Sequence, residues 1–438
     1  MTGPLEQVAP VGIRIRLPGP GAPRAVATLA AANQRARADA IDLIDRVFPS
    51  VAFGRLAQQT DDATFAASSA PTDLSGWLDP VALLDRVLTT HDLAEGRMKL
   101  MQEGSDSGAS TALSQLRDST PLALAPAGRL AAAFDRGNTV VIDAIDRRDR
   151  SLARLAEAVG RTFGCPVNIN GYVSYRPKQA FGTHWDSHEV FILQLLGRKR
   201  WSLHQPFALS PHQHLHDQHA NGEEIWRGEL EPGSYLAIPR GWAHTVESLN
   251  ELSFHLTVTT PRLTVVDLVR WAVRRSDRAP ADALLYPPHE GPTDEFVDAL
   301  ADHLGRAVAP ERIELAAATA RANLASHPTQ SLRQLLGALE GRTPPERLWF
   351  RSPHPGGVHW AATADGTGHL AFDKRTVTCP DEVLELVAPL LDGRCHRVAD
   401  IAERTADPAA TVELVRQGLR SGLLEVVDPT TWGVVVAD

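Results

Sequence analysis

Alternation of apolar and polar positions is clearest in the middle of the chain. Residues 167–174 alternate, and the apolar run at 189–196 ends at Gly197. A Glu-Pro-Gly turn at 231–233 precedes the next apolar stretch. Short strands separated by Gly and Pro favour a double-sheet barrel over a parallel α/β sheet. The pattern predicts strands at 139–145, 167–174, 189–196, 198–204, 233–239 and 252–259.

Helical spacing of apolar residues appears on both sides of these strands. Within 150–163, Leu152, Leu155, Val159 and Phe163 share one helical face. The last part of the chain combines short strands at 358–373 and 423–427 with helical segments. The pattern predicts helices at 36–47, 79–88, 150–163, 265–273, 293–304, 313–324, 380–391, 398–404 and 408–421.

The most informative polar residues are His184, Asp186 and His244, with 60 residues between the first and the last. We expect His184 and Asp186 on one strand, where side chains two positions apart share a face. Two imidazoles and one carboxylate form the facial triad of non-haem Fe(II) oxygenases, which leaves the opposite coordination face open. A jelly roll brings distant antiparallel strands together, so the separation of the third ligand is expected. A lone His-x-Asp is a weak signal, and the surrounding strands strengthen it.

Residues 75–262 resemble the JmjC-type cupin domain of the 2-oxoglutarate-dependent ribosomal oxygenases. The resemblance implies a mainly β catalytic domain with some α, folded as a double-stranded β-helix (jelly roll, cupin). It also implies a helical dimerisation region and a C-terminal winged-helix domain. The expected division is 1–70, a partly helical N-terminal extension; 71–262, the catalytic domain; 263–345, the dimerisation region; and 346–438, the winged-helix-like domain. The matching stretches are 170–172, 183–186, 193–201, 231–233, 238–244 and 255–259.

The resemblance also implies Fe(II), 2-oxoglutarate and O₂ as cofactor and co-substrates. Lys199 matches the residue that pairs with the distal carboxylate of 2-oxoglutarate. A dianion in a dry barrel needs such a fixed cation, because burying an unpaired carboxylate is very costly. Tyr172 matches a second co-substrate contact, Asn170 shares its strand face, and Thr259 stands where the family often has a small hydroxyl residue. The alternative is that Tyr172 and Thr259 are ordinary strand residues.

Three functions are compatible with these residues. The resemblance implies a 2-oxoglutarate-dependent dioxygenase that hydroxylates an Arg or His side chain of a ribosomal protein, with succinate and CO₂ as co-products. The alternative is a tailoring hydroxylase of a peptide or small-molecule natural product that uses the same chemistry. A non-enzymatic cupin-like binding protein is the third possibility, and the complete triad together with Lys199 argues against it.

Several further histidines need separate interpretation. His188 shares the face of His184 and Asp186 if the extended geometry continues, and we interpret it as a polar residue near the pocket rim. His255 also lies on a predicted strand, but His244 is preferred as the third ligand because Pro239-Arg-Gly-Trp precedes it. A histidine-rich stretch predicts a surface loop between strands rather than a second metal site. Its histidines are His204, His212, His214, His216 and His219.

Charge argues against nucleic acid as a partner. The chain carries a net charge of −9. Residues 346–438 contain nine Arg and Lys against fourteen Asp and Glu, a net charge of −5. Binding to phosphates requires a dense basic face, so we expect no direct DNA binding. An acidic surface favours encounter with a cationic protein or peptide.

The cysteines and the apolar runs bear on localisation. Three cysteines, Cys165, Cys379 and Cys395, are widely scattered, which is typical of a reducing compartment. The first residues have neither a basic head nor an apolar stretch, so we expect no secretory signal. No apolar run approaches the roughly 18 residues that span a bilayer. We therefore expect a cytoplasmic protein with no membrane association, and the family resemblance implies that it is a homodimer.

Overall fold

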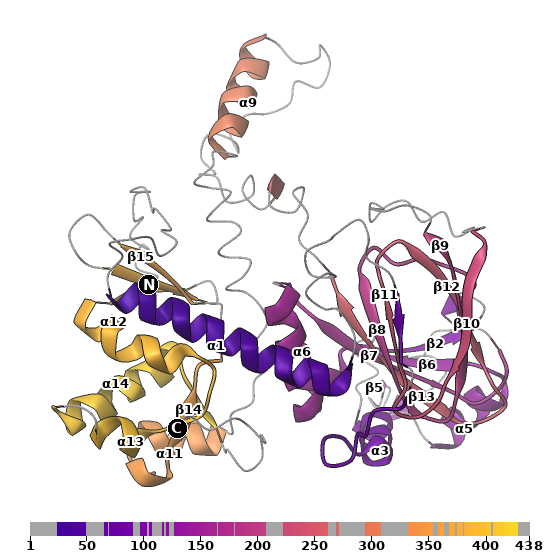
Figure 1. The fold of residues 1–438 in the computed structure, drawn as a ribbon, viewed down its shortest axis with the longest axis horizontal. Helices are drawn as coiled ribbons and strands as arrows, with labels where there is room; N and C mark the ends of the chain where they lie inside the picture. The colour runs from indigo at the N-terminus through magenta and orange to yellow at the C-terminus, as the bar shows by residue number, and fades with distance from the viewer. Residues whose placement is uncertain are drawn as a thin grey trace. The chain divides into compact units, whose positions relative to one another are not determined.

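The fold is described from a computed structural model, in which the chain divides into two compact units (Figure 1). One unit is Ala38–Arg262, and the other combines Met1–Arg37 with Leu263–Asp438. The structure describes residues 24–49, 65–68, 70–90, 97–102, 105–106, 116–117, 120–121, 127–163, 165–178, 180–206, 222–261, 269–270, 294–307, 332–353, 358–362, 368–372, 375–379, 381–403 and 406–427.

The unit Ala38–Arg262 is built on two antiparallel sheets that face each other. Figure 1 shows β8, β11 and β7 on one side of the barrel and β9, β10 and β12 on the other. The predicted double-sheet barrel is therefore confirmed. The larger sheet has the order β1 (Ala66–Ala67), β11 (Tyr235–Ile238), β8 (Glu189–Leu196), β13 (Ser253–Thr260), β7 (Asn168–Ser174), β6 (Thr139–Ile142), β2 (Met98–Gln102) and β3 (Ser105–Asp106). The smaller sheet has the order β10 (Glu224–Leu230), β9 (Lys199–Pro206) and β12 (Trp242–Ser248), and a separate short ladder pairs β4 (Leu116–Arg117) with β5 (Thr120–Pro121).

Strand β8 contributes to two hydrophobic cores. Phe191 and Leu193 belong to the core outside the barrel, which also contains helix residues. Val190 and Ile192 belong to the core between the sheets, together with Trp201. Because both faces of β8 are buried, its sequence is a continuous apolar run rather than an alternation.

Helices cover the larger sheet on its outer face. Helix α6 (Arg150–Phe163) buries Leu152 and Val159 in the same core as Phe191, which confirms the predicted helix and its apolar face. Asp149 caps α6 by accepting a hydrogen bond from the backbone N–H of Leu152 at 3.0 Å. The other helical elements of this unit are α3 (Pro80–Thr90), α5 (Ala127–Asp135) and the short 3₁₀ helix η1 (Ile145–Arg147).

Helix α1 (Arg24–Val47) is longer than the predicted helix at 36–47. The Ala-rich residues before position 36 favour a helix, so the helix extends to Arg24. The end of α1 belongs to the unit Ala38–Arg262, where the buried Phe48 ring lies 6.0 Å from the ring of Phe191 and 5.8 Å from that of Tyr235. Part of the segment predicted as an N-terminal extension therefore packs in the β-rich unit; the domain boundaries themselves stay predictions.

The other unit has a separate core around Phe350 and Phe372. Its strands form two three-stranded sheets, and Arg351 Nε and Glu425 Oε1 make a buried ion pair at 2.6 Å. The predicted helix at 408–421 is present. The one predicted at 380–391 is an α-helix over Asp381–Val387 followed by a 3₁₀ helix over Ala388–Leu391, and the one predicted at 398–404 is a helix over Val398–Glu403. The sheets are β18 (His396–Arg397), β14 (Trp349–Arg351) and β19 (Glu425–Val427), and β15 (His359–Ala362), β16 (Gly368–Phe372) and β17 (Arg375–Cys379). The helical elements are α9 (Asp294–Ala307), α11 (Leu332–Leu339), η2 (Pro345–Arg347), α12 (Asp381–Val387), η3 (Ala388–Leu391), α13 (Val398–Glu403) and α14 (Pro408–Ser421).

Two of the predicted helices cannot be compared in full. The segment 313–324 lies outside the described residues, and of 265–273 only residues 269–270 are described, as helix. The predicted helix at 293–304 corresponds to α9. In the part of the chain that the structure describes, no helix combines the length and apolar character that crossing a bilayer requires.

Candidate metal and co-substrate site

The three predicted metal ligands come together at a backbone bridge between His184 and His244. The N–H of His244 donates to the carbonyl of His184 at 2.8 Å, and the N–H of His184 donates back at 3.1 Å. The carbonyl of Asp186 accepts a hydrogen bond from the N–H of Gly241 at 2.8 Å. These bonds fasten the His184–Asp186 segment to the residues that lead into β12.

The expectation that His184 and Asp186 lie on a strand was wrong. The segment around them is not part of a regular strand, and His184 forms only an isolated bridge. Gly241 has a φ of +81°, a left-handed turn conformation that suits glycine. The turn at Gly241 and the bridge, rather than alternation along one strand, bring the ligands together.

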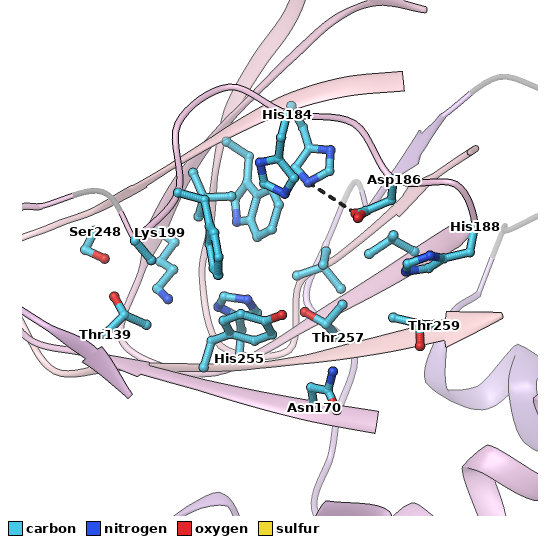
Figure 2. A pocket seen from close by; sticks show the side chains of 18 of the residues that line it. Thr139, Asn170, His184, Asp186, His188, Lys199, Ser248, His255, Thr257 and Thr259 are labelled. Atoms are coloured by element: carbon cyan, nitrogen blue, oxygen red, sulfur yellow. Dashed lines mark ion pairs between the residues drawn. The ribbon is translucent and has the colours of Figure 1, made fainter. Parts of the chain in front are cut away.

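The geometry of the triad fits a metal ion. One candidate ligand atom from each of His184, Asp186 and His244 lies within 4.8 Å of the other two. The Nε2 atom of His244 is 3.7 Å from Oδ2 of Asp186, and the two imidazole centroids are 4.3 Å apart. Figure 2 shows His184 near Asp186, and its dashed line marks the ion pair between Asp186 and His244.

Backbone carbonyls orient both imidazoles. Nδ1 of His184 lies 2.9 Å from the carbonyl of Gly182, and Nδ1 of His244 lies 3.3 Å from that of Trp242. With its proton on Nδ1, each ring presents the lone pair of Nε2 to a metal. Burial, and secondarily the neighbouring His184, lower the pKa of His244 to about 4. A neutral imidazole is the form that binds metal, so the donor set fits a divalent ion such as Fe(II).

A pocket of about 420 Å³ joins the triad to the four predicted co-substrate residues. Lys199, Tyr172, Asn170 and Thr259 all line it. In Figure 2, Lys199 and Asp186 lie at different ends of the pocket. The remaining lining residues are Thr139, Asn168, Ala180, Phe181, His184, Asp186, His188, Val190, Ile192, Trp201, His244, Val246, Ser248, His255 and Thr257.

Lys199 is a buried cation at one end of this pocket. Lys199 is only 2% exposed, and burial lowers the pKa of its ammonium group to about 7. Among the described residues, no carboxylate forms an ion pair with it. A buried ammonium without a counter-charge is unfavourable, so the pocket is suited to an anionic ligand at this end.

Tyr172 and His255 form part of the pocket wall. The rings of Tyr172 and His255 stack with centroids 4.9 Å apart and planes 3° apart. Burial, together with the charges of Asp186 and Asp143, raises the pKa of the Tyr172 phenol. The phenol therefore keeps its proton and can donate a hydrogen bond.

The side chains of Asn170 and Thr259 each make a hydrogen bond within the protein. Oδ1 of Asn170 accepts a hydrogen bond from the N–H of Ala144 at 2.9 Å, which leaves the amide NH₂ group for other partners. Oγ1 of Thr259 donates to the carbonyl of Asn168 at 3.3 Å. The hydroxyl of Thr259 can still accept a hydrogen bond from a ligand.

His188 enters the pocket, although the sequence favoured a rim position. Figure 2 shows it at the same end as Asp186, near Thr259. His204 lies near the end of β9, with its Nδ1 atom 3.1 Å from the carbonyl of Gly222. His212, His214, His216 and His219 lie outside the described residues, and so does the loop prediction for them.

Sequence reasoning did not assign several lining residues. Thr257 could have been found, because it lies two positions from Thr259 on the same face of β13. His255 was considered only as a competing metal ligand. Thr139 and Ser248 have no sequence signal of their own, since only the folded sheets bring them beside Lys199.

Comparisons with known proteins agree with this site. Residues 142–268 match the family described as the JmjC domain. Ribosomal oxygenase 2 of Rattus norvegicus is 38% identical over 112 residues, which are 25% of this chain and 24% of that protein. The bifunctional lysine-specific demethylase and histidyl-hydroxylase NO66 of Caenorhabditis elegans is 32% identical over 116 residues, 25% of this chain and 16% of that protein. The chain thus spans a quarter or less of the length of these relatives.

Solved structures of the ribosomal oxygenase YcfD from Escherichia coli are also similar. One covers 86% of this chain and 99% of its own, with a TM-score of 0.48 and 16% identity. Another, in complex with cobalt and 2-oxoglutarate, has a TM-score of 0.46 and 15% identity, and covers 81% of this chain and 92% of its own. The family match and the site together make this chain a JmjC domain protein related to the ribosomal oxygenases. The matched residues 142–268 include all three members of the candidate metal triad.

Proposed function

We propose that the chain is an Fe(II)- and 2-oxoglutarate-dependent hydroxylase. The observation that carries this proposal is the buried, unneutralised Lys199 in the same pocket as the triad. The triad supplies three ligands for a metal, and Lys199 supplies a charge for the distal carboxylate of the co-substrate. Together they fit a ligand that chelates the metal at one end and is anionic at the other.

When bound, iron, 2-oxoglutarate and O₂ would supply the oxidising chemistry, in which one oxygen atom of O₂ enters a substrate C–H bond and the other enters succinate, with release of CO₂. His184, Asp186 and His244 would hold the iron. Lys199 would neutralise the co-substrate, and Tyr172, Asn170 and Thr259 would fix its orientation. The apolar walls formed by Val190 and Ile192 exclude water, which strengthens these electrostatic contacts.

We propose an Arg or His side chain of a ribosomal protein as the substrate. The relatives include ribosomal oxygenases and a histidyl-hydroxylase. Among the described residues that line the pocket, the only carboxylate belongs to Asp186, a proposed metal ligand. A guanidinium would therefore lack a counter-charge beyond the metal site, whereas a neutral imidazole needs only the hydroxyl and amide groups present. This charge balance favours His over Arg.

We make less specific proposals for the other parts of the chain. Helix α9 exposes Val297, Leu300 and Leu304, which stand one helical turn apart along one stripe. An exposed apolar stripe within 263–345 supports the proposal that this region makes a homodimer. The helices and small sheets of 346–438 support a winged-helix-like domain without DNA binding, and we propose a cytoplasmic location.

Intact-mass spectrometry of ribosomal proteins tests the proposed function. Ribosomal proteins from a strain lacking this gene would be incubated with the purified chain, Fe(II), ascorbate and 2-oxoglutarate, with His184→Ala as the control. The expected result is the gain of one oxygen on one ribosomal protein, with a histidine located by fragmentation. Succinate formation without any such gain would direct the search to peptides and small molecules. Absence of both would contradict the proposal.

A further inference from the structure

Two threonines flank the backbone bridge between the histidines of the triad. Thr183 precedes His184 in the chain, and Thr245 follows His244. The bridge pairs the two histidines in antiparallel register, so Thr183 stands opposite Thr245. Their Oγ1 atoms are 2.8 Å apart, and one hydroxyl therefore donates a hydrogen bond to the other. This threonine pair links the two ligand segments through side chains, next to the backbone bonds of the bridge.

The threonine pair lies on the side of the bridge that faces away from the pocket. Side chains on either side of a paired residue generally point to the opposite face. His184 and His244 line the pocket, whereas Thr183 and Thr245 are not among its lining residues. Neither hydroxyl is therefore placed to touch a substrate or the co-substrate. Any effect of the pair on a metal must act through the position of the two imidazoles.

Trp185 and Ala243 make an apolar contact on the other side of the bridge, where the same register sets them opposite each other. Both residues are buried, and together they form a small cluster of their own. Apolar contacts have no preferred direction, whereas a hydrogen bond is restricted in distance and angle. Of the two contacts that flank the bridge, the threonine pair is therefore the one that can fix the spacing of the ligand segments.

Thr245 has a further neighbour at a longer distance. Its Oγ1 atom lies 3.4 Å from Nε2 of His204, beyond the usual range of such hydrogen bonds. Nδ1 of His204 lies 3.1 Å from the carbonyl of Gly222, so the backbone also holds this ring. With its proton on Nδ1, the ring can only accept from Thr245 through Nε2, and Thr183 is then the donor within the threonine pair. The shorter contact with Thr183 is the stronger of the two.

We propose that Thr183 and Thr245 are positioning residues for the metal, because their hydrogen bond holds His184 and His244 at the separation that one ion requires. A hydroxyl pair across two strands stabilises their pairing. Here the backbone contributes an isolated bridge instead of a continuous ladder, so the side-chain bond matters more. Groups that orient metal ligands without touching the ion contribute to metal affinity. The inference rests on the proposed function in one respect, namely that the triad binds a metal.

Titration of the full chain with Mn(II) tests this assignment without turnover. Thr183→Val and Thr245→Val keep the size of the side chain and remove the hydroxyl, and each should raise the Kd for Mn(II) roughly fivefold. Because the two hydroxyls form one bond, the double variant should also lose roughly fivefold. Two independent effects would multiply to a loss of roughly twenty-five-fold.

Two further variants separate positioning from a general effect on the fold. Thr245→Ser keeps the hydroxyl and should bind Mn(II) like the wild type. Thr162→Val removes a hydroxyl that donates to the carbonyl of Ala158 within α6 and lies outside the pocket, so it should leave the Kd unchanged. The absorption spectrum of the Co(II)-loaded chain, which depends on the geometry of the ligands, should change in Thr245→Val and not in Thr245→Ser.

The outcomes also separate this inference from the proposed function. A wild-type Kd for Mn(II) in both valine variants would overturn the inference and leave the function standing. A multiplicative loss in the double variant would overturn it too, because the hydroxyls would then act separately. Failure of the wild type to bind Mn(II) would overturn the function and the inference together. The expected Mn(II) results without any succinate formation would support the inference and contradict the function alone.

Discussion

His184 and His244 exchange two backbone hydrogen bonds at 2.8 and 3.1 Å across 60 residues of chain. The bridge, which consists of backbone bonds alone, places their imidazoles next to each other. Rigid placement of ligands by the backbone reduces the ordering that binding requires. The triad is therefore held by the fold, and removal of one ligand should affect the metal more than the protein.

His184→Ala and Asp186→Ala should each reduce succinate formation below about one hundredth of the wild-type rate, because an iron ligand is lost. Metal affinity, measured by titration with Mn(II), should fall in parallel while the thermal transition changes little. His204→Ala is the matched control, since this residue is not part of the triad. Undiminished turnover in either ligand variant would refute the triad.

Lys199→Met should mainly weaken co-substrate binding. Truncation of one partner of a buried charge pair costs about 2–5 kcal/mol, so the KM for 2-oxoglutarate should rise about thirtyfold or more. Arg198→Met provides the control, because Arg198 is exposed and pairs with Glu229 and Glu251. An unchanged KM in Lys199→Met would remove the central support for the proposed function.

Co-substrate affinity should depend on pH through Lys199. Its pKa in the unliganded protein is about 7 because of burial. Below pH 7 the ammonium is already charged, whereas above pH 7 most molecules must take up a proton to bind the anion. The Kd for 2-oxoglutarate should therefore rise with pH, by up to about tenfold per pH unit, over about pH 7 to 9. Calorimetry in buffers of different ionisation enthalpy would detect the proton uptake, and Lys199→Arg, whose guanidinium stays charged, should abolish most of it.

Gly197→Ala should destabilise the barrel at the turn between β8 and β9. Gly197 has a φ of +56°, and a Cβ there would meet the carbonyl oxygen of Leu252 at 1.9 Å. We expect a loss of more than about 1 kcal/mol in the free energy of unfolding, measured with denaturant. Gly182→Ala is the control, because a Cβ at Gly182 meets nothing within 4 Å. Equal stability of the two variants would contradict this account of the turn.

A charge on the exposed stripe of α9 should disrupt the proposed homodimer. Leu300→Glu places a carboxylate in the middle of the stripe formed by Val297, Leu300 and Leu304. Light scattering should give a dimer mass for the wild type and a monomer mass for this variant. Ile225→Glu, on an equally exposed apolar residue of β10, should leave the dimer intact. A monomeric wild type would refute the dimer.

Regular elements with a strong periodic signal could be predicted from the sequence. Helix α6 matches the prediction at both ends, and β8 matches its apolar run. Strand β10 was missed because most of it is exposed and it carries charged residues that face solvent. Its position depends on pairing with β9, which no local pattern reports.

The site was predictable to the extent that it depends on motifs. The predicted ligands and co-substrate residues line one pocket, although the strand expected around His184 is absent. Thr139 and Ser248 could not be predicted, because they come from different sheets and meet Lys199 only in the folded barrel. Threonine and serine are common residues, and these two positions have no distinctive spacing from the motifs in the sequence.

The two buried faces of β8 have a consequence for cooperativity. Phe191 ties this strand to the helices, and Ile192, the next residue, ties it to the smaller sheet. Loss of either core would expose one face of β8. Because the other core packs on the opposite face of the same strand, it would be destabilised as well. The barrel and its covering helices should therefore unfold in one transition, and the pocket should disappear with them rather than before them.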